Sequence, residues 1–263
     1  MAEPLRVSLD AAKGILTLTL ARPEKKNALD LEMLRLLHES LERARFDPEV
    51  RVVVLAAQGD VFSAGGDIEV MRKHAGDAQA ALARLRGGIN KVVASLHSLP
   101  KPVLAQVQGN AYGAGALLAF QCDLALAAEE ATFSLSFRHV GLIPDTGGTW
   151  LLPRRVGLQR AKHLTWTAAP FTAADAAAWG LILRVVPQTQ LEGTVNQLAA
   201  SLADGPASAI ALAKRAFHEN LGAGIEDALD REAHLQTQAF LTAEHAEGRD
   251  AFFSRRKPDF RKG

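Results

Sequence analysis

The sequence predicts an α/β core followed by a helical C-terminal part, and three observations support this fold class. The continuous apolar run Val52–Ala57 fits a strand that is buried on both faces. Residues 58–66 and 108–116 resemble each other: each combines a Gln-Gly turn, an aromatic residue and small residues that open a helix. After Trp150 the pattern becomes mostly helical. The repetition suggests stacked strand–turn–helix units in one domain, although two copies do not prove a solenoid.

Composition indicates an ordinary globular protein. The chain has 263 residues, of which 48% are hydrophobic and 22% charged, and its formal net charge is +1. This balance gives no indication of nucleic acid or an anionic membrane as a partner. No uninterrupted apolar stretch reaches the roughly 18 residues of a spanning helix, and the N-terminus lacks the pattern of a signal peptide. A cytoplasmic protein is expected.

Cysteine and histidine usage argues against a metal centre or a disulfide framework. Cys122 is the single cysteine, and it lies in an apolar run that favours a core position over a nucleophile. The eight histidines show no spacing typical of metal ligands. We therefore expect neither a bound metal nor a disulfide.

Individual elements follow from local patterns. Arg6 to Leu20 reads as a β-hairpin, and Asp30 can cap a helix whose leucines share one face. Val103–Val107 is a second strand, and residues 77–99 are helical with an interruption at Gly87-Gly88. Further helices are expected at residues 158–165, 173–179, 191–203, 207–220 and 224–242, with a short strand at 183–186. Gly205-Pro206 predicts a boundary between a core of residues 1–204 and a helical region of residues 205–263.

The two small-residue runs have a possible chemical use. Glycine and alanine allow close backbone approach, and the first N–H groups of a helix have no partner within the helix. Two such helix starts could point free N–H donors at one position and form an oxyanion hole. Tight packing between strand and helix explains the same residues equally well, so both interpretations stay open.

Asp145 is the main candidate for a catalytic side chain. It stands between Pro144 and a pair of glycines in residues 141–150, among apolar neighbours. Desolvation there would raise its pKa and suit it to accept and return a proton. The alternative is a turn aspartate that caps the next helix. His139, two residues before this stretch, is interpreted as a surface or packing residue.

Several motifs, in order along nearly the whole chain, resemble the enoyl-CoA hydratase/isomerase (crotonase) superfamily. They are residues 22–29 (Arg-Pro-Glu-Lys-Lys-Asn-Ala-Leu), 62–68 (Phe-Ser-Ala-Gly-Gly-Asp-Ile), 109–115 (Gly-Asn-Ala-Tyr-Gly-Ala-Gly), 122–123 and 141–149. The resemblance implies a spiral of repeated ββα units with a helical C-terminal trimerisation region. It implies an acyl-coenzyme A substrate, no metal or redox cofactor, and a homotrimer or a dimer of trimers.

The resemblance also implies site residues. The N–H groups of Gly66 and Ala114 would hold the thioester oxygen, although the family usually has glycine at the second position. The coenzyme A part would lie along two segments, with a contribution from the C-terminal end of this or a neighbouring chain. The residues concerned are Lys25, Lys26, Ala28, Ala64, Gly65, Asp67, Ile68, Phe252 and Arg255. Asp67 fits a structural role at a helix start better than a catalytic one.

Departures from the family pattern distinguish isomerisation from hydration. Hydratases of the family use two glutamates, and Leu117 and Phe137 occupy those positions here. Both side chains would line the substrate site and keep water out. Asp145 resembles the isomerase branch, and residues 141–154 are most similar to bacterial 1,2-epoxyphenylacetyl-CoA isomerases.

The expected activity is therefore isomerisation with one aspartate as acid and base. It would convert 1,2-epoxyphenylacetyl-CoA to oxepin-CoA, 3-enoyl-CoA to 2-enoyl-CoA, or both, in phenylacetate or fatty-acid catabolism. An enoyl-CoA hydratase of broad specificity is the first alternative. A binding protein with the crotonase fold and no catalysis is the second, and the balanced charge argues against its binding RNA.

Overall fold

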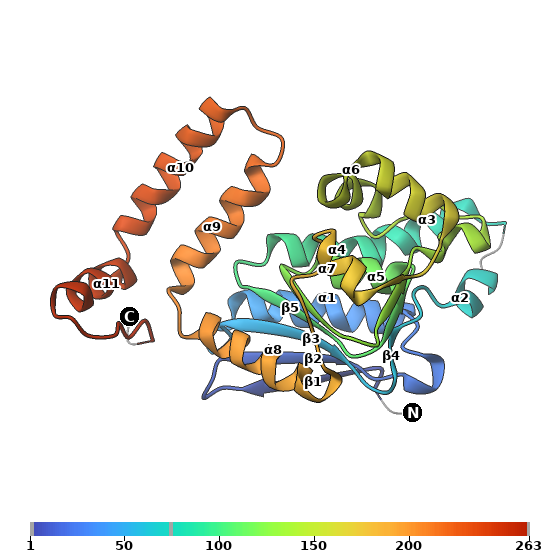
Figure 1. The fold of residues 1–263 in the computed structure, drawn as a ribbon, viewed down its shortest axis with the longest axis horizontal. Helices are drawn as coiled ribbons and strands as arrows, with labels where there is room; N and C mark the ends of the chain where they lie inside the picture. Colours follow the sequence, from blue (N-terminus) through green and yellow to red (C-terminus); the bar gives the residue numbers. More distant parts are fainter. Residues whose placement is uncertain (1–2, 74–75, 262–263) are drawn as a thin grey trace.

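Two β-sheets form the centre of the protein, whose structure is a computed structural model that describes residues 3–73 and 76–261 (Figure 1). The larger sheet contains, in spatial order, β1 (Leu5–Asp10), β2 (Ile15–Leu20), β3 (Val52–Ala57), β5 (Val103–Val107), β7 (Leu124–Ala128) and β10 (Arg184–Val186). The smaller sheet contains β4 (Val61–Ser63), β6 (Asn110–Tyr112), β8 (Thr132–Ser134) and β9 (Phe171–Thr172).

The strands are connected as a spiral of stacked units. β3, β5 and β7 are parallel neighbours in the larger sheet, and each is followed directly by β4, β6 or β8, which are parallel neighbours in the smaller sheet. Antiparallel pairing is confined to the β1–β2 hairpin, as predicted, and to β8–β9 among the described strands. Each unit therefore adds one strand to each sheet, which confirms the expected α/β class and the repeated ββα architecture.

The third unit, β7 and β8, is not recognisable as a repeat from its sequence, although its two strands continue the pattern of the first two units. It carries Glu129-Glu130 where the first two units carry Gln-Gly, so its turn does not match theirs. The short strands β4 and β6 were also missed, because three residues are too few to show an alternating pattern.

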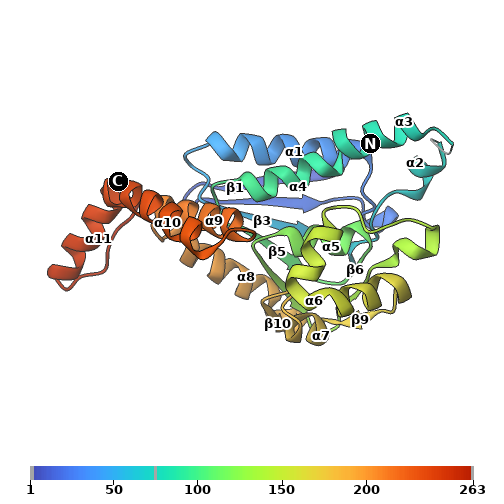
Figure 2. The same ribbon diagram turned by 90° about the horizontal axis from the view of Figure 1, so that it is seen from above.

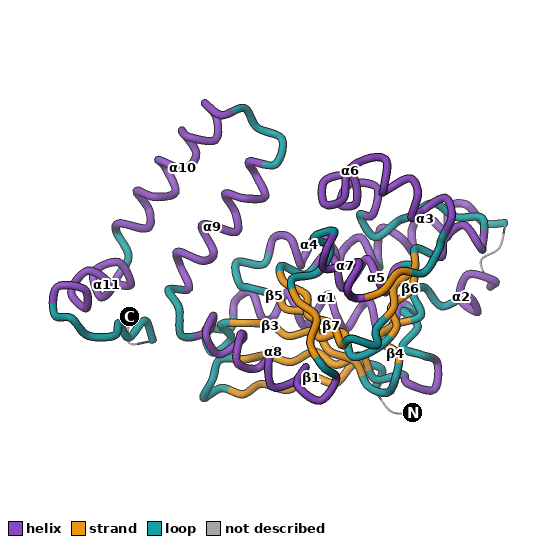
Figure 3. Tube along the Cα trace, in the orientation of Figure 1, coloured by secondary structure: helices purple, strands orange, loops and turns teal. Residues whose placement is uncertain are grey.

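Helices surround the sheets (Figure 3). Their bounds are η1 (Pro23–Lys25), α1 (Leu31–Phe46), α2 (Ile68–Lys73), α3 (Ala78–Gly87), α4 (Ile89–Ser98), α5 (Ala114–Gln121), η2 (Ser136–Val140), α6 (Gly148–Thr167), α7 (Ala173–Ala178), α8 (Gln188–Ala203), α9 (Ala207–Asn220), α10 (Ile225–Phe240) and α11 (Ala243–Phe253). The helix expected at residues 158–165 is the end of α6, which begins ten residues earlier and is interrupted by a left-handed Gly157 with φ 75°. The other predicted helices are confirmed within a few residues.

Local capping agrees with the sequence. The Asp30 side chain accepts a hydrogen bond of 2.8 Å from the Met33 N–H at the start of α1. Asp77 caps α3 in the same way, through the Ala80 N–H at 2.9 Å. Gly88 separates α3 from α4, where the paired glycines predicted an interruption.

The hydrophobic core lies on both faces of the larger sheet. Val53 and Leu55 of β3 join the main cluster, which α1, α4 and α5 cover (Figure 2). Val52 and Val54 point the other way and join a second cluster completed by α8. β3 is thus buried on both faces, as its uninterrupted apolar run predicted.

The last three helices, α9 to α11, extend away from the sheets as an arm (Figures 1 and 2). No residue of α9 is fully buried, and α10 buries Leu235 alone. Large apolar side chains are exposed along the arm, among them Phe217, Ile225 and Leu229. Within residues 3–73 and 76–261, no helix is both long enough and apolar enough to cross a bilayer.

The repeated turns depend on close contact between backbone segments. Replacing a glycine at such a contact by alanine, which adds one methyl group, tests this. A Cβ atom at Gly109 would lie 1.9 Å from the Asp60 carbonyl oxygen, whereas one at Gly222 would meet nothing within 4 Å. We predict that Gly109→Ala lowers the free energy of unfolding by about 1–3 kcal/mol or more, the usual cost of overpacking. Gly222→Ala should stay close to wild type. Urea denaturation of both variants measures this, and equal midpoints would contradict the packing argument.

Candidate active site

A cavity of about 260 Å³ lies where the first two repeated units meet the loop before α6. It collects side chains from segments far apart in the sequence. Its lining residues are Leu29, Leu34, Ala64, Gly66, Ile68, Met71, Arg84, Leu85, Ile89, Gly113, Ala114, Ser136, Phe137, His139, Val140, Leu142 and Asp145. Most are apolar, and Ile68, Val140 and Leu142 at its edge are at least 48% exposed. An exposed apolar rim of this kind suits an apolar ligand.

Glycines allow the two small-residue runs to touch. A Cβ atom at Gly65, where φ is 91°, would lie 2.7 Å from the Tyr112 carbonyl oxygen and 3.2 Å from the Ala114 nitrogen. A Cβ atom at Gly115 would lie 2.6 Å from the Ser63 side chain. The first turn of α5 therefore packs directly on the end of β4, and larger residues at these positions would separate the two segments.

The two predicted N–H donors line the same cavity. Ala114 is the first residue of α5 and Gly66 follows β4. Among the residues that the structure describes, neither N–H has a hydrogen-bond partner. The expectation of two helix starts is wrong for the first segment, because Gly66 lies in an extended bridge opposite Leu29 and α2 begins at Ile68.

The two segments predicted to bind coenzyme A lie side by side. The Ala64 N–H donates to the Lys26 carbonyl at 2.9 Å, and the Leu29 N–H donates to the Gly65 carbonyl at 2.8 Å. Ala64, Gly66 and Ile68 line the cavity, whereas Lys25, Lys26 and Ala28 lie outside it. The exposed Lys25 ammonium lies 3.2 Å from the Glu69 carboxylate.

Asp67 does not line the cavity and has a structural position just before α2, as its predicted role at a helix start implies, while its assignment to ligand binding stays a prediction. Its buried carboxylate lies 3.2 Å from the Arg22 guanidinium and also accepts from the Glu69 N–H at 3.0 Å. Arg22 pairs with Asp30 at 3.0 Å and donates to the Ala28 carbonyl at 2.7 Å. Arg22 thus joins the loop around residue 28 to the segment that carries Gly66.

The two positions that depart from the hydratase pattern differ in the structure. Phe137, on η2, lines the cavity as expected. Leu117 is fully buried below it and does not line it, which corrects the prediction. A Cβ atom at Gly148 would lie 2.5 Å from the Leu117 side chain, so Leu117 packs between α5 and the start of α6.

Phe252 and Arg255 do not reach the cavity of their own chain. Phe252 lies at the end of α11 and is 79% exposed, and Arg255 follows in a left-handed conformation with φ 53°. Figures 1 and 2 show α11 at the opposite end of the molecule from α2 and α3, whose residues line the cavity. A role for these two residues would require a neighbouring chain.

Asp145 does not cap a helix, so the capping interpretation is wrong. α6 begins at Gly148 after Gly147, and no side chain caps it. The half-buried Asp145 carboxylate lines the cavity and accepts a hydrogen bond of 2.8 Å from the Thr146 hydroxyl. Burial raises the pKa of Asp145, while the Thr146 bond and the positive charge of Arg84 oppose part of that rise.

Other polar groups line the cavity that no motif predicts, among them His139, which the sequence indicates only as a surface or packing residue. Arg84, on α3, lines it, and its buried Nε atom has no hydrogen-bond partner among the described residues. Ser136 and the exposed His139, both on η2, also line it. No motif marks these residues, because α3 and η2 reach the cavity only through tertiary packing.

The described part of the chain contains no cluster of side chains suited to hold a metal ion and no exposed cysteine suited to thiol chemistry. No group of three or more His, Cys, Asp or Glu side chains is placed there to hold a metal ion. Cys122 is buried, and this burial raises the pKa of its thiol. A buried thiol of this kind is unreactive, which agrees with the predicted core position.

The fold and the cavity first define a class: α/β proteins of stacked ββα units, in which two residues with free backbone N–H groups and one carboxylate residue line a largely apolar cavity. The family model of enoyl-CoA hydratase/isomerase matches residues 10–263. The chain therefore belongs to the enoyl-CoA hydratase/isomerase family and is an enzyme of the crotonase superfamily.

Relatives of both activities are equally similar. A probable enoyl-CoA hydratase of Rhodobacter capsulatus is 39% identical over 97% of each chain. The 1,2-epoxyphenylacetyl-CoA isomerase of Escherichia coli K12 is also 39% identical, over 94% of this chain and 95% of its own. The crystal structure of an enoyl-CoA hydratase of Mycobacterium smegmatis superposes with a TM-score of 0.93 at 33% identity, covering 98% of this chain and 99% of that one.

Burial and the nearby favourable groups act in opposite directions on the pKa of Asp145, and a titration can measure the result. Its pKa should lie above the ordinary value of about 3.9, and Arg84→Met should raise it further, because the variant removes a positive charge that favours the carboxylate. Carboxyl ¹³C chemical shifts followed against pH give both values. Asp10 is an internal control, since its hydrogen bond with Lys13 lowers its pKa. An Asp145 pKa below the ordinary value would contradict this assignment of causes.

Proposed function

We propose that this protein is an acyl-CoA isomerase in which Asp145 is the single acid and base and the N–H groups of Gly66 and Ala114 form an oxyanion hole. One observation carries the proposal. Asp145 is the only carboxylate among the described residues that line the cavity, and Gly66 and Ala114, whose N–H groups have no partner among those residues, line it too.

The proposed reaction moves one proton. With a 3-enoyl-CoA, the Asp145 carboxylate removes a proton from the carbon next to the thioester carbonyl. The negative charge passes to the thioester oxygen, where the Gly66 and Ala114 N–H groups stabilise it. Protonated Asp145 then returns the proton to the far carbon of the original double bond, which gives the 2-enoyl-CoA. No atom is gained or lost, so neither a metal nor a redox cofactor is required.

The lining of the cavity favours proton transfer over hydration. Hydration requires activation of a water molecule as well as delivery of a proton, which two carboxylates can share. Here Phe137 lines the cavity at one of the two family positions, and the apolar Leu117 fills the other below it. An apolar wall disfavours a bound, activated water and protects a reactive enolate from it.

The substrate is proposed from similarity. The E. coli relative is named an isomerase of 1,2-epoxyphenylacetyl-CoA, which supports an aromatic epoxide, a 3-enoyl chain, or both as the acyl group in phenylacetate or fatty-acid breakdown. The equally similar relative named a probable hydratase supports the alternative of a broad enoyl-CoA hydratase. Substrate assays separate the two.

We predict that the wild-type protein shifts the double bond of a 3-enoyl-CoA and hydrates a 2-enoyl-CoA slowly at most. Asp145→Asn should lower the isomerisation rate by about 10²–10⁴-fold, the usual contribution of a general acid–base group, and acyl-CoA binding should persist. Asp10→Asn, on the remote β1 strand, is the matched control and should leave the rate unchanged. Spectrophotometric assays with both thioesters and with the epoxide measure this.

Two results would decide against the proposal. Fast hydration of the 2-enoyl-CoA without migration of the double bond would favour the hydratase. Full activity of Asp145→Asn would exclude the one-base mechanism. A third function, a binding protein without catalysis, would be supported by inactivity toward every thioester together with salt-dependent RNA binding that Asp145→Asn leaves unaltered.

The coenzyme A part is proposed to lie along the loop at Lys25, Lys26 and Ala28 beside Ala64 to Ile68. Exposed lysines there can meet phosphates without entering the cavity. Phe252 and Arg255 are proposed to contribute from a neighbouring chain, because their own chain holds them far from the cavity.

The arm of α9 to α11 supports a proposed homotrimer or dimer of trimers. Its exposed apolar side chains, such as Ile225 at 73% and Phe240 at 56%, would be buried against other subunits. We predict a solution mass of three or six times the 28.1 kDa of one chain. Leu229→Glu on the exposed face of α10 should shift it toward smaller species. Light scattering after size-exclusion chromatography measures this, and a wild-type mass of one chain would contradict it.

A further inference from the structure

The far end of α5 holds the loop that carries Asp145. Gln121, the last residue of α5, is 6% exposed. Its Nε2 atom donates a buried hydrogen bond of 2.8 Å to the carbonyl oxygen of Thr146, the residue after Asp145. Gln121 lies outside the candidate active-site cavity and lines a second cavity of about 500 Å³.

The turn held in this way has an uncommon backbone. Thr146 has φ 54° and Gly147 has φ 71°, so two consecutive residues are left-handed, and the first is not glycine. Thr146 is almost completely buried. A Cβ atom at Gly147 would lie 2.4 Å from the Gln121 amide nitrogen, so the amide sits directly against the turn. Such a conformation persists when its surroundings fix it.

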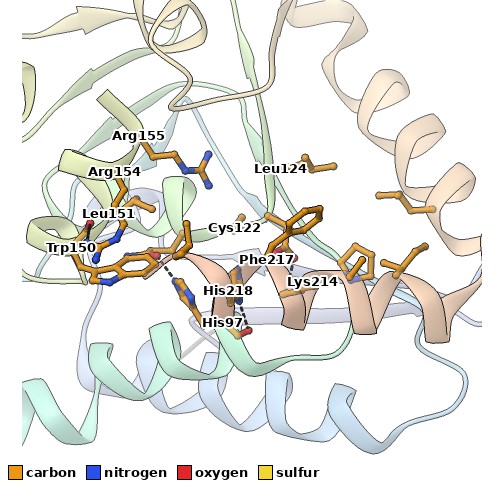
Figure 4. Close-up of a pocket in the computed structure, with 17 residues that line it drawn as sticks. His97, Cys122, Leu124, Trp150, Leu151, Arg154, Arg155, Lys214, Phe217 and His218 are labelled. Atoms are coloured by element: carbon orange, nitrogen blue, oxygen red, sulfur yellow. Dashed lines mark hydrogen bonds and ion pairs between the residues drawn. The ribbon is translucent and has the colours of Figure 1, made fainter. Parts of the chain in front are cut away.

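The orientation of the Gln121 amide is determined by its two partners. The Thr146 carbonyl can only accept, so the NH₂ group must face it, and Oε1 then faces His97 Nε2 at 2.8 Å. His97 Nε2 must therefore carry a hydrogen and donate it. Figure 4 shows His97 in the second cavity, between Trp150 of α6 and His218 of α9.

We propose that Gln121 is a positioning residue for Asp145: its amide fixes the left-handed turn, and His97 fixes the amide. The inference rests on the proposed function of Asp145 as the base. One buried helix then aligns both halves of the reaction, because α5 presents the Ala114 N–H at its first residue and holds the base loop through its last. The alternative is a role in stability alone.

The test compares Gln121→Glu and Gln121→Met with wild type in the 3-enoyl-CoA assay. The first keeps the shape and the acceptor for His97 but, when ionised at pH 8, lacks the N–H donor, and the second lacks both. We expect kcat to fall by about 10–100-fold, as small displacements of a reacting group do, with KM nearly unchanged. Gln108→Met is the matched control, since it removes a glutamine bond of 2.9 Å to the Gly59 carbonyl and should keep kcat.

The pH dependence of kcat separates positioning from stability. A loosened turn weakens the hydrogen bond from the Thr146 hydroxyl to Asp145, so the acid limb of the profile should move to higher pH. The other charged or titratable groups that line the cavity, Arg84 and His139, are not substituted in these variants. A purely structural role would lower the melting temperature and leave both kcat and the acid limb of the folded protein unchanged, which would overturn the proposal.

Two further measurements separate a failure of this inference from a failure of the proposed function or of folding. Asp145→Asn, assayed in parallel, tests the proposed base itself. If Asp145→Asn stays active, the proposed function fails. If Asp145→Asn loses activity while both Gln121 variants keep the wild-type kcat, this inference alone is refuted. If neither Gln121 variant folds, His97→Leu tests the same bond from its other side. It should lower kcat and shift the acid limb in the same direction, and a wild-type profile would contradict the proposal.

Discussion

The arrangement of the candidate site depends on one close contact, between the end of β4 and the first turn of α5. Gly65 and Gly115 stand where a side chain would collide with the Tyr112 carbonyl or with Ser63, so the two repeated units approach to backbone distance. This approach places the N–H groups of Gly66 and Ala114 on one cavity. A glycine pair at this contact is thus a requirement of the site, and the cavity follows from the packing of repeats.

Much of this arrangement could be predicted from local sequence, because interactions between residues close together in the chain determine it. The apolar run of β3 and the Asp30 cap of α1 need no tertiary information. The ion pair of Asp67 could not be predicted in this way, since its partner Arg22 is 45 residues away. Arg84 was missed for the same reason: it is an ordinary helix residue until α3 packs beside the loop of Asp145.

Electrostatics at Asp145 are a balance between opposing effects. Burial beside apolar side chains disfavours the carboxylate, which would be useless as a base if it stayed protonated. The Thr146 hydroxyl and the Arg84 guanidinium favour the charged form of Asp145 and so oppose the rise in its pKa. A carboxyl group with a raised pKa can both take a proton and give it back, which the proposed isomerisation demands of one residue.

The two halves of the site share α5 but depend on different contacts of that helix. The N–H donors depend on the contact between repeats, within the sheet-containing core. Asp145 depends on a polar chain through Thr146, Gln121 and His97, and the His97 carbonyl lies 3.1 Å from Nδ1 of His218 on α9.

The ring of His218 also lies against that of His97, with the two centroids 4.7 Å apart, and burial lowers the pKa of His218. Lys214, one turn earlier on α9, reaches Asp123 just beyond α5 at 2.7 Å. α9 thus touches the core at the same place where the core holds its proposed base. α9 has no fully buried residue of its own, so its attachment to the core depends on contacts such as these. Placement of the base is thereby linked physically to the packing of the C-terminal helices.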